Sequence, residues 1–122
     1  MQLTPTHKFM LFTLGFWYLE ANKKLKDKQL EVFISKVIFI DIIKKAGIVE
    51  KQPRAIYKNL EILEKNKLIW YENKSLSLTK KGRKIFNKIY EENKPYINVT
   101  KLLAEKDPLS YSKRIQTKFS LE

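Results

Sequence analysis

The chain has 122 residues, of which 43% are hydrophobic and 31% are charged, and a chain of this length typically folds as one domain. It has no cysteine, which excludes disulfide frameworks, thiolate zinc sites and cysteine nucleophiles. The 25 basic and 13 acidic residues give a net charge of +12, which is enough to attract polyanions.

The excess positive charge is concentrated in the middle third of the chain. Residues 44–84 contain 12 basic and 4 acidic side chains, a net charge of +8. The longest apolar run, Phe9 to Leu19, has 11 residues, whereas a membrane-spanning helix needs about 20. We therefore expect a cytoplasmic protein with no membrane span and no export signal.

The first segment, residues 1–28, is predicted to form a long helix. Thr4 can cap it and Pro5 suits its first position. Apolar side chains such as Phe9, Leu14, Trp17 and Tyr18 surround almost the whole helix, so it must be covered on more than one side. A second subunit or the C-terminal tail would supply that cover; the alternative is a central core helix in a monomer.

A short strand and a second helix are expected next. Residues 30–34 alternate as a short strand or extended link does, and Ser35 is a suitable N-cap. Apolar residues recur at helical spacing from Lys36 to Ala46, and Lys44, Lys45 and Gly47 are typical of a helix end. The β-branched run 37–43 would also suit a buried strand.

A third helix is predicted over residues 52–66, with Pro53 in its first turn. Ile56, Leu60 and Leu63 follow each other at helical spacing and define a narrow buried stripe. The opposite side of the helix is polar and mostly cationic, and consists of Arg54, Lys58, Glu61 and Lys65, flanked by Lys51 and Tyr57.

Residues 67–72 and 75–79 have the composition and alternation of two strands, and Asn73-Lys74 can form the tight turn between them. The second strand places Ser75 and Ser77 on one face, as at a half-buried sheet edge. Thr79 is expected to cap a fourth helix that ends before Pro95.

The last segment, residues 95–122, is predicted to be a helical extension. Residues 98–105 suit a short helix, and Asp107-Pro108 is a good start for another. Leu109, Ile115 and Phe119 are its sparse apolar positions.

The order helix, turn, helix, hairpin, helix is that of a winged helix-turn-helix, and residues 55–86 also resemble one family in detail. The run at Leu60, Leu63, Leu68 and Ile69 and the run at Leu78, Thr79, Lys81, Gly82 and Arg83 are similar to those of archaeal and bacterial transcriptional regulators of the MarR and PadR type. These 32 residues carry the detailed resemblance, and the resemblance as a whole covers about 45 to 50 residues. Asn66 stands where such proteins often carry glycine, and asparagine tolerates the same left-handed conformation.

The resemblance implies a mainly α protein with a small β-hairpin wing (α+β). We expect one domain over residues 1–122: a winged helix-turn-helix core at 35–94 with added N-terminal (1–28) and C-terminal (95–122) helices. Helix 52–66 would enter the major groove of double-stranded DNA, and wing 68–79 would contact the backbone or the minor groove.

Arg54 is the best base-reading residue, because its planar fork can pair with a guanine edge. The other DNA-binding residues would hold phosphates or base edges. The predicted DNA-binding set is Lys51, Gln52, Arg54, Tyr57, Lys58, Lys65, Lys74, Lys80, Lys81, Arg83 and Lys84.

A homodimer is expected, since two-fold symmetry would present two recognition helices. Its predicted interface is Phe9, Leu14, Trp17, Tyr18, Leu109, Ile115 and Phe119. No cofactor, metal or small-molecule effector is assigned.

Two other classes of function compete with DNA binding. Winged helices also dock onto proteins, here through Trp17, Tyr18, Trp70 or Tyr71, and RNA binding would need exposed aromatic side chains among the lysines. An enzyme is not expected, because the single histidine, His7, is predicted to be exposed and inert, and the chain has no phosphate-binding glycine loop.

Overall fold

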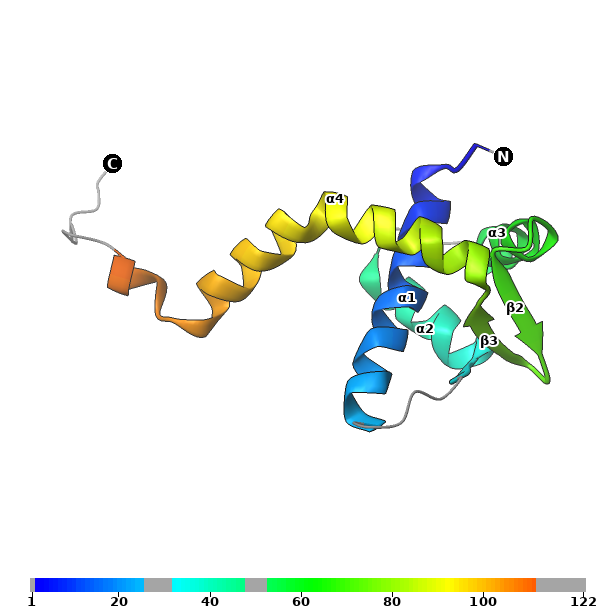
Figure 1. Cartoon of the computed structure of the whole chain (residues 1–122), viewed down its shortest axis with the longest axis horizontal. Helices are drawn as coiled ribbons and strands as arrows, with labels where there is room; N and C mark the ends of the chain where they lie inside the picture. Colours follow the sequence, from blue (N-terminus) through cyan, green and yellow to red (C-terminus); the bar gives the residue numbers. More distant parts are fainter. Residues whose placement is uncertain (1, 26–31, 48–52, 112–122) are drawn as a thin grey trace. The chain divides into compact units, whose positions relative to one another are not determined.

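The computed structural model describes residues 2–25, 32–47 and 53–111 (Figure 1). The elements in chain order are α1 (Pro5–Leu25), β1 (Ile34–Ser35), α2 (Lys36–Ala46), α3 (Pro53–Lys65), β2 (Ile69–Glu72), β3 (Ser75–Leu78), α4 (Lys80–Glu105) and the short 3₁₀ helix η1 (Pro108–Tyr111). The described fold is mainly helical with one three-stranded antiparallel sheet, which confirms the predicted α+β class. Residue contacts divide the chain into a first unit, Met1–Tyr90, and a second unit, Glu91–Glu122.

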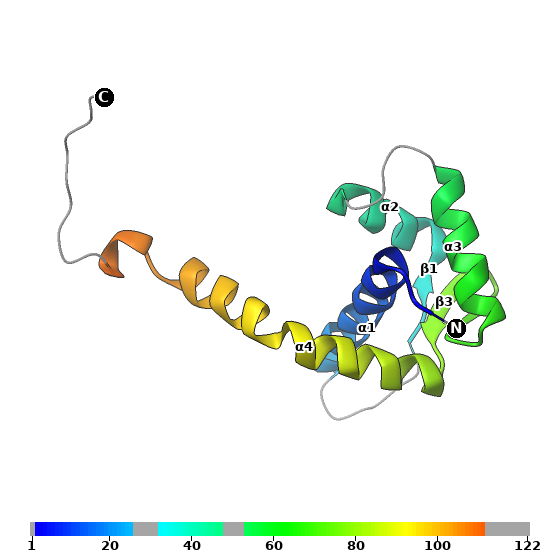
Figure 2. The ribbon, with the colours of Figure 1, turned by 90° about the horizontal axis from the view of Figure 1, so that it is seen from above.

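Helix α1 is the central element of the first unit. It begins as predicted, because the Thr4 hydroxyl accepts a hydrogen bond from the His7 amide at 3.1 Å. Met10, Leu11 and Leu14 are buried, and α1 contacts α2, α3 and β3 (Figure 2). The first unit itself therefore covers these faces of α1, as expected of a central core helix.

The N-terminal half of α4 also packs closely on α1. The ring of Phe86 occupies the space into which a Cβ at Gly15 would project. Phe12 and Phe16 lie beside this contact, with the Phe12 and Phe86 ring centroids 6.0 Å apart. Gly15 is thus required by the close approach of α1 and α4.

Helix α2 has both predicted caps. The Ser35 hydroxyl accepts from the Ile38 amide at 3.4 Å, and Gly47 has a left-handed φ of 80° while its N–H donates to the Lys44 carbonyl. The strand alternative for residues 37–43 is therefore wrong, because the caps and the buried spacing of Phe39 and Ile43 outweigh β-branched propensity.

The end of α3 differs from the prediction by one residue. Lys67, with a φ of 60°, takes the left-handed position that was assigned to Asn66. The amides of Lys67 and Leu68 donate to the carbonyls of Glu64 and Leu63, which is the Schellman pattern. Asn66 instead uses its side chain to donate to the Ile62 carbonyl at 2.8 Å.

The sheet has the strand order β1-β3-β2. Ile34 pairs with Leu76 across β1 and β3, and Ile69 pairs with Leu78 across β2 and β3. Asn73 and Lys74 form the predicted turn with φ values of 51° and 61°, as a type I′ hairpin requires.

The expected position of β3 at a sheet edge is wrong. β3 is the central strand, because the short strand β1 pairs with its free side. Ser77, expected on the open face, is buried. This pairing was missed because it joins residues that are 40 to 42 positions apart in the chain.

The two ends of the hairpin meet in a cluster of backbone contacts that we call the hairpin base: Lys67, Leu68, Thr79 and Gly82. The Thr79 hydroxyl donates to the Lys67 carbonyl at 2.7 Å and accepts from the Gly82 amide at 2.9 Å. The Thr79 amide donates to the Leu68 carbonyl. One threonine therefore caps α4 and fixes it to the end of α3.

Sixteen buried apolar side chains from α1, α2, α3, the sheet and α4 form one core. They are Met10, Leu11, Leu14, Ile34, Phe39, Ile40, Ile43, Ile56, Leu60, Leu63, Leu68, Ile69, Leu76, Leu78, Phe86 and Ile89. All of them belong to the first unit.

The predicted end of the fourth helix before Pro95 is wrong. Helix α4 continues through Pro95 to Glu105 and includes the segment 98–105 that was predicted as a separate helix. Proline removes one hydrogen-bond donor, but its fixed φ is helical, and the turns on either side offset the lost bond. Pro108 begins η1, where the Asp107 carboxylate accepts from the Leu109 amide at 3.1 Å.

Substitution of Gly82 tests the hairpin base. A Cβ at Gly82 would collide with the backbone carbonyl of Leu68, which cannot move without breaking its bond from Thr79. We expect Gly82→Ala to lower the free energy of unfolding by about 2 to 3 kcal/mol, measured by urea denaturation. The matched control is Gly47→Ala, which meets no atom within 4 Å and pays only the left-handed conformation, about 1 kcal/mol. Equal losses for both variants would contradict the close-approach explanation.

Candidate nucleic-acid interface

Helix α3 has the two faces that its sequence predicts. Ile56, Leu60 and Leu63 are buried in the core. Arg54, Tyr57, Lys58, Glu61 and Lys65 are exposed on the rest of the helix. The helix is therefore held by its apolar stripe, and its mostly cationic face is left open to a ligand.

Two predicted contact residues of this helix, Lys51 and Gln52, lie outside the described residues.

Tyr57 is part of a cluster that the sequence analysis missed. The Lys36 ammonium lies 5.2 Å from the Tyr57 ring centroid and 4.7 Å from the Tyr71 ring centroid. These residues come from α2, α3 and β2, and we call them the Lys36 cluster. A cation shared by two rings fixes the start of α2 against α3 and the hairpin.

The turn of the hairpin is also tied to α2. The Lys36 amide donates to the Lys74 carbonyl at 3.0 Å, while the Lys74 side chain is exposed. The backbone at the turn is thus fixed, while the Lys74 ammonium remains available to an anion.

The first turns of α4 add further cations: three exposed lysines and one half-buried arginine, Arg83. Lys80, Lys81 and Lys84 are exposed, and the Lys81 ammonium lies 3.4 Å from the Asn66 carbonyl at the end of α3. Lys81 therefore lies beside the C-terminal end of α3.

Arg83 is placed differently from these lysines. Its guanidinium donates to the Tyr18 hydroxyl at 3.1 Å and lies 5.4 Å from the centroid of the same ring. This half-buried arginine bridges α4 and α1. Its contact with Tyr18 has a structural role that the assignment to DNA binding did not foresee.

The aromatic residues of β2 have unequal exposure. Tyr71 is half-buried in the Lys36 cluster, while Trp70 is 47% exposed. The Trp70 ring meets the Phe33 ring at 5.4 Å in an edge-to-face contact. Trp70 is therefore supported by Phe33, the residue before β1.

The predicted dimer residues of α1 are mostly used within the first unit. Leu14 is 1% exposed and belongs to the core, so its assignment to a subunit interface is wrong. Phe9 and Trp17 are half-buried against the same core. The core of the first unit therefore accounts for part of the all-round apolar pattern of α1, while Leu19 is 38% exposed.

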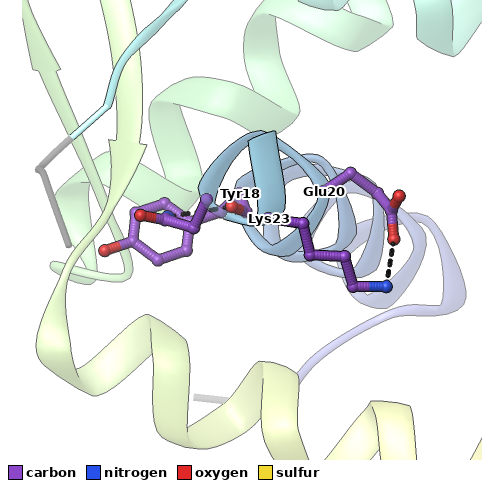
Figure 3. Close-up of polar contacts among 4 residues, drawn as sticks. Tyr18, Glu20 and Lys23 are labelled. Carbon is purple, nitrogen blue, oxygen red and sulfur yellow. Dashed lines mark hydrogen bonds and ion pairs between the residues drawn. The ribbon is translucent and has the colours of Figure 1, made fainter. Parts of the chain in front are cut away.

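The C-terminal end of α1 is polar on one side. Tyr18 points to one side of the helix, and the ion pair of Glu20 and Lys23, at 3.0 Å, lies on the other (Figure 3). Both side chains of this pair are exposed to solvent, and an exposed ion pair contributes little to stability.

The C-terminal dimer residues have separate outcomes. Leu109 is exposed, whereas Ile115 and Phe119 lie outside the described residues.

His7 is buried, so the expectation of an exposed histidine is wrong. Its Nδ1 accepts from the Thr4 amide at 3.2 Å, which completes the reciprocal cap at the start of α1. Within the described ranges, no three His, Asp or Glu side chains are grouped to hold a metal ion.

Comparison of the chain with protein-family models, curated proteins and solved structures finds no match. Among the described helices, none is long and apolar enough to cross a membrane.

Replacement of Lys36 tests the cluster. Lys36→Met keeps the length of the side chain but removes the cation, so we expect a loss of about 1 to 2 kcal/mol in the free energy of unfolding for two cation–π contacts. Lys45→Met on the same helix is the matched control, because it removes only the exposed pair with Asp41, worth about 0.5 kcal/mol. Urea denaturation of both variants measures the difference, and a loss for Lys36→Met no larger than for the control would exclude a stabilising role.

Proposed function

We propose that this chain is a double-stranded DNA-binding protein of the winged helix-turn-helix type, acting as a transcriptional regulator. In this proposal α2 and α3 are the helix-turn-helix, α3 is the recognition helix, and β2 and β3 form the wing. The observation that carries it is the polarity of α3, whose apolar stripe is buried while Arg54, Lys58 and Lys65 are exposed.

The distribution of charge supports a polyanionic partner. The first unit has 19 basic and 8 acidic residues, net +11, while the second has 6 and 5, net +1. From Lys65 to Tyr90 inclusive, the chain contains one acidic residue, Glu72, and eight basic ones. Exposed lysines at this density supply affinity for phosphates without choosing a sequence.

Arg54 is the proposed base-reading residue. It lies in the first turn of α3 and is exposed, and the N-terminal residues of a recognition helix are those that reach base edges. Lys74 at the hairpin turn and Lys80 and Lys84 in α4 would hold phosphates. Tyr57 would act from a restrained position, because the Lys36 ammonium packs on its ring.

One observation favours a protein partner as the second candidate function. Val37 and Ile38 on α2 are 76% and 56% exposed, which is unusual for adjacent β-branched residues on a solvated helix. If neither Lys74→Ala nor Arg54→Ala changes the binding of duplex DNA, protein docking becomes the better proposal. RNA binding has less support, since the ring of Trp70 already packs on Phe33.

A homodimer is part of the proposal, but its surface is moved from α1 to the second unit. Two first units, each with a net charge of +11, repel each other, whereas the second unit is nearly neutral. Tyr96, Val99 and Leu103 are exposed at helical spacing on α4 and form one apolar face. A second copy of the chain is the partner that carries the same face.

DNA binding is tested by fluorescence anisotropy at several salt concentrations, with a random duplex and a duplex selected from a random pool. We expect Lys74→Ala to weaken binding to both duplexes alike. It should also lower the slope of log affinity against log salt concentration by about 0.9 per subunit. Arg54→Ala should cost about 1 to 3 kcal/mol on the selected duplex and much less on the random one.

The matched control is Lys8→Ala, which removes an exposed lysine of α1. It should change the affinity for neither duplex by a comparable amount. If Arg54→Ala weakens both duplexes equally, Arg54 does not read bases. If neither variant affects binding, α3 is not the DNA-binding helix.

The dimer is tested by sedimentation velocity at micromolar concentration. We expect a species of twice 14.6 kDa, and Leu103→Glu should convert it to monomer because a carboxylate would be buried in the apolar contact. Val37→Glu places the same charge at an exposed apolar site of the first unit and should leave the dimer intact. A wild-type chain that sediments only as monomer contradicts the dimer, and a dimer that survives Leu103→Glu does not use this face.

A further inference from the structure

The outer face of the sheet contains a set of side chains that the proposed DNA contacts do not use. Trp70 is paired with Ser77, and Glu72 is paired with Ser75. Paired residues point to the same face, and so do residues two apart on one strand. Trp70, Ser77, Glu72 and Ser75 therefore share one face of the hairpin.

Phe33 closes one side of this face. It directly precedes β1, where Ile34 is paired with Leu76, so the register brings residue 33 level with Ser77. The contact of the Phe33 and Trp70 rings at 5.4 Å spans the same position. Ser77 itself is buried, and its Oγ has no hydrogen-bond partner among the described residues.

Next to this aromatic pair the surface is hollowed. A depression of about 340 Å³ is lined by Phe33, Glu72, Asn73 and Ser75. It combines one aromatic side chain with a carboxylate, an amide and a hydroxyl. Three of its four lining residues are polar, so a ligand here would be held mainly by charge and hydrogen bonds, with the ring of Phe33 as its apolar contact.

Glu72 gives this depression its chemical preference. It is exposed and makes no ion pair with any described residue, although the chain has 25 basic residues. A carboxylate beside an aromatic ring attracts an organic cation, through charge and through the ring. A single carboxylate is too few ligands for a divalent metal, and it repels the phosphates of nucleic acid.

We propose that this depression binds a small planar organic cation, such as an aromatic amidine or amine. The flat body of the ligand stacks on Phe33, its charged nitrogen pairs with Glu72, and Asn73 and Ser75 bond to its remaining polar groups. The site lies on the outer face of the sheet and does not depend on the proposed DNA binding.

The test is a titration of the ¹⁵N-labelled full chain, without DNA, followed by two-dimensional NMR. The probe is benzamidine, and the neutral control of the same shape is benzamide. We expect benzamidine to shift the indole signal of Trp70 and the side-chain amide of Asn73, saturating with a dissociation constant of about 1 mM, as suits so small a ligand. Benzamide should leave these signals nearly unchanged.

Two variants separate the site from general surface charge. Glu72→Gln keeps the shape of the side chain and should lower the affinity for benzamidine about fivefold to tenfold. The rest of the spectrum should show an intact fold. Glu61→Gln removes an exposed carboxylate from α3 and should not alter the affinity.

Equal binding of benzamide and benzamidine, an unchanged affinity in Glu72→Gln, or an absence of shifts at about 10 mM probe, ten times the expected constant, would each overturn the proposal. Because no DNA is present, any of these results leaves the DNA-binding proposal to its own test.

Discussion

The hairpin base is the constraint on which the arrangement of the first unit depends. The Thr79 hydroxyl connects the Lys67 carbonyl to the Gly82 amide, so the end of α3, both ends of the hairpin and the start of α4 are fixed at one point. A Cβ at Gly82 would have no room there. The threonine and the glycine of the motif at residues 78–83 thus have a structural explanation, which is independent of any ligand.

Much of the fold was predictable because its signals are local. The caps at Ser35 and Gly47, the buried stripe of α3 and the turn at Asn73-Lys74 each depend on a few neighbouring residues. One error arose where distant residues decide: β3 became a central strand through pairing with β1. Another was local: the fourth helix continues through Pro95, because one missing hydrogen bond does not end a long helix.

The candidate interface also has a part that local spacing predicts and a part that residues of other elements decide. The exposed cations of α3 follow from helix geometry and were found from spacing alone. Tyrosines from other elements decide the roles of Lys36 and Arg83: Lys36 lies between Tyr57 and Tyr71, and Arg83 bonds to Tyr18. A cation that packs on a tyrosine of another element leaves no periodic trace in the sequence. Charge counting consequently identified the region but not which of its cations hold the structure together.

The two proposals meet at Glu72, and physical linkage determines the sign of their interaction. Glu72 is the single acidic residue between Lys65 and Tyr90, so it lowers the positive potential of the hairpin next to Lys74. A cation bound to Glu72 would neutralise that charge and strengthen the attraction for a phosphate backbone. Linkage is reciprocal, so DNA at the hairpin would raise the affinity for the cation by the same factor. A planar cation on the outer face of the sheet would therefore promote DNA binding, without touching α3.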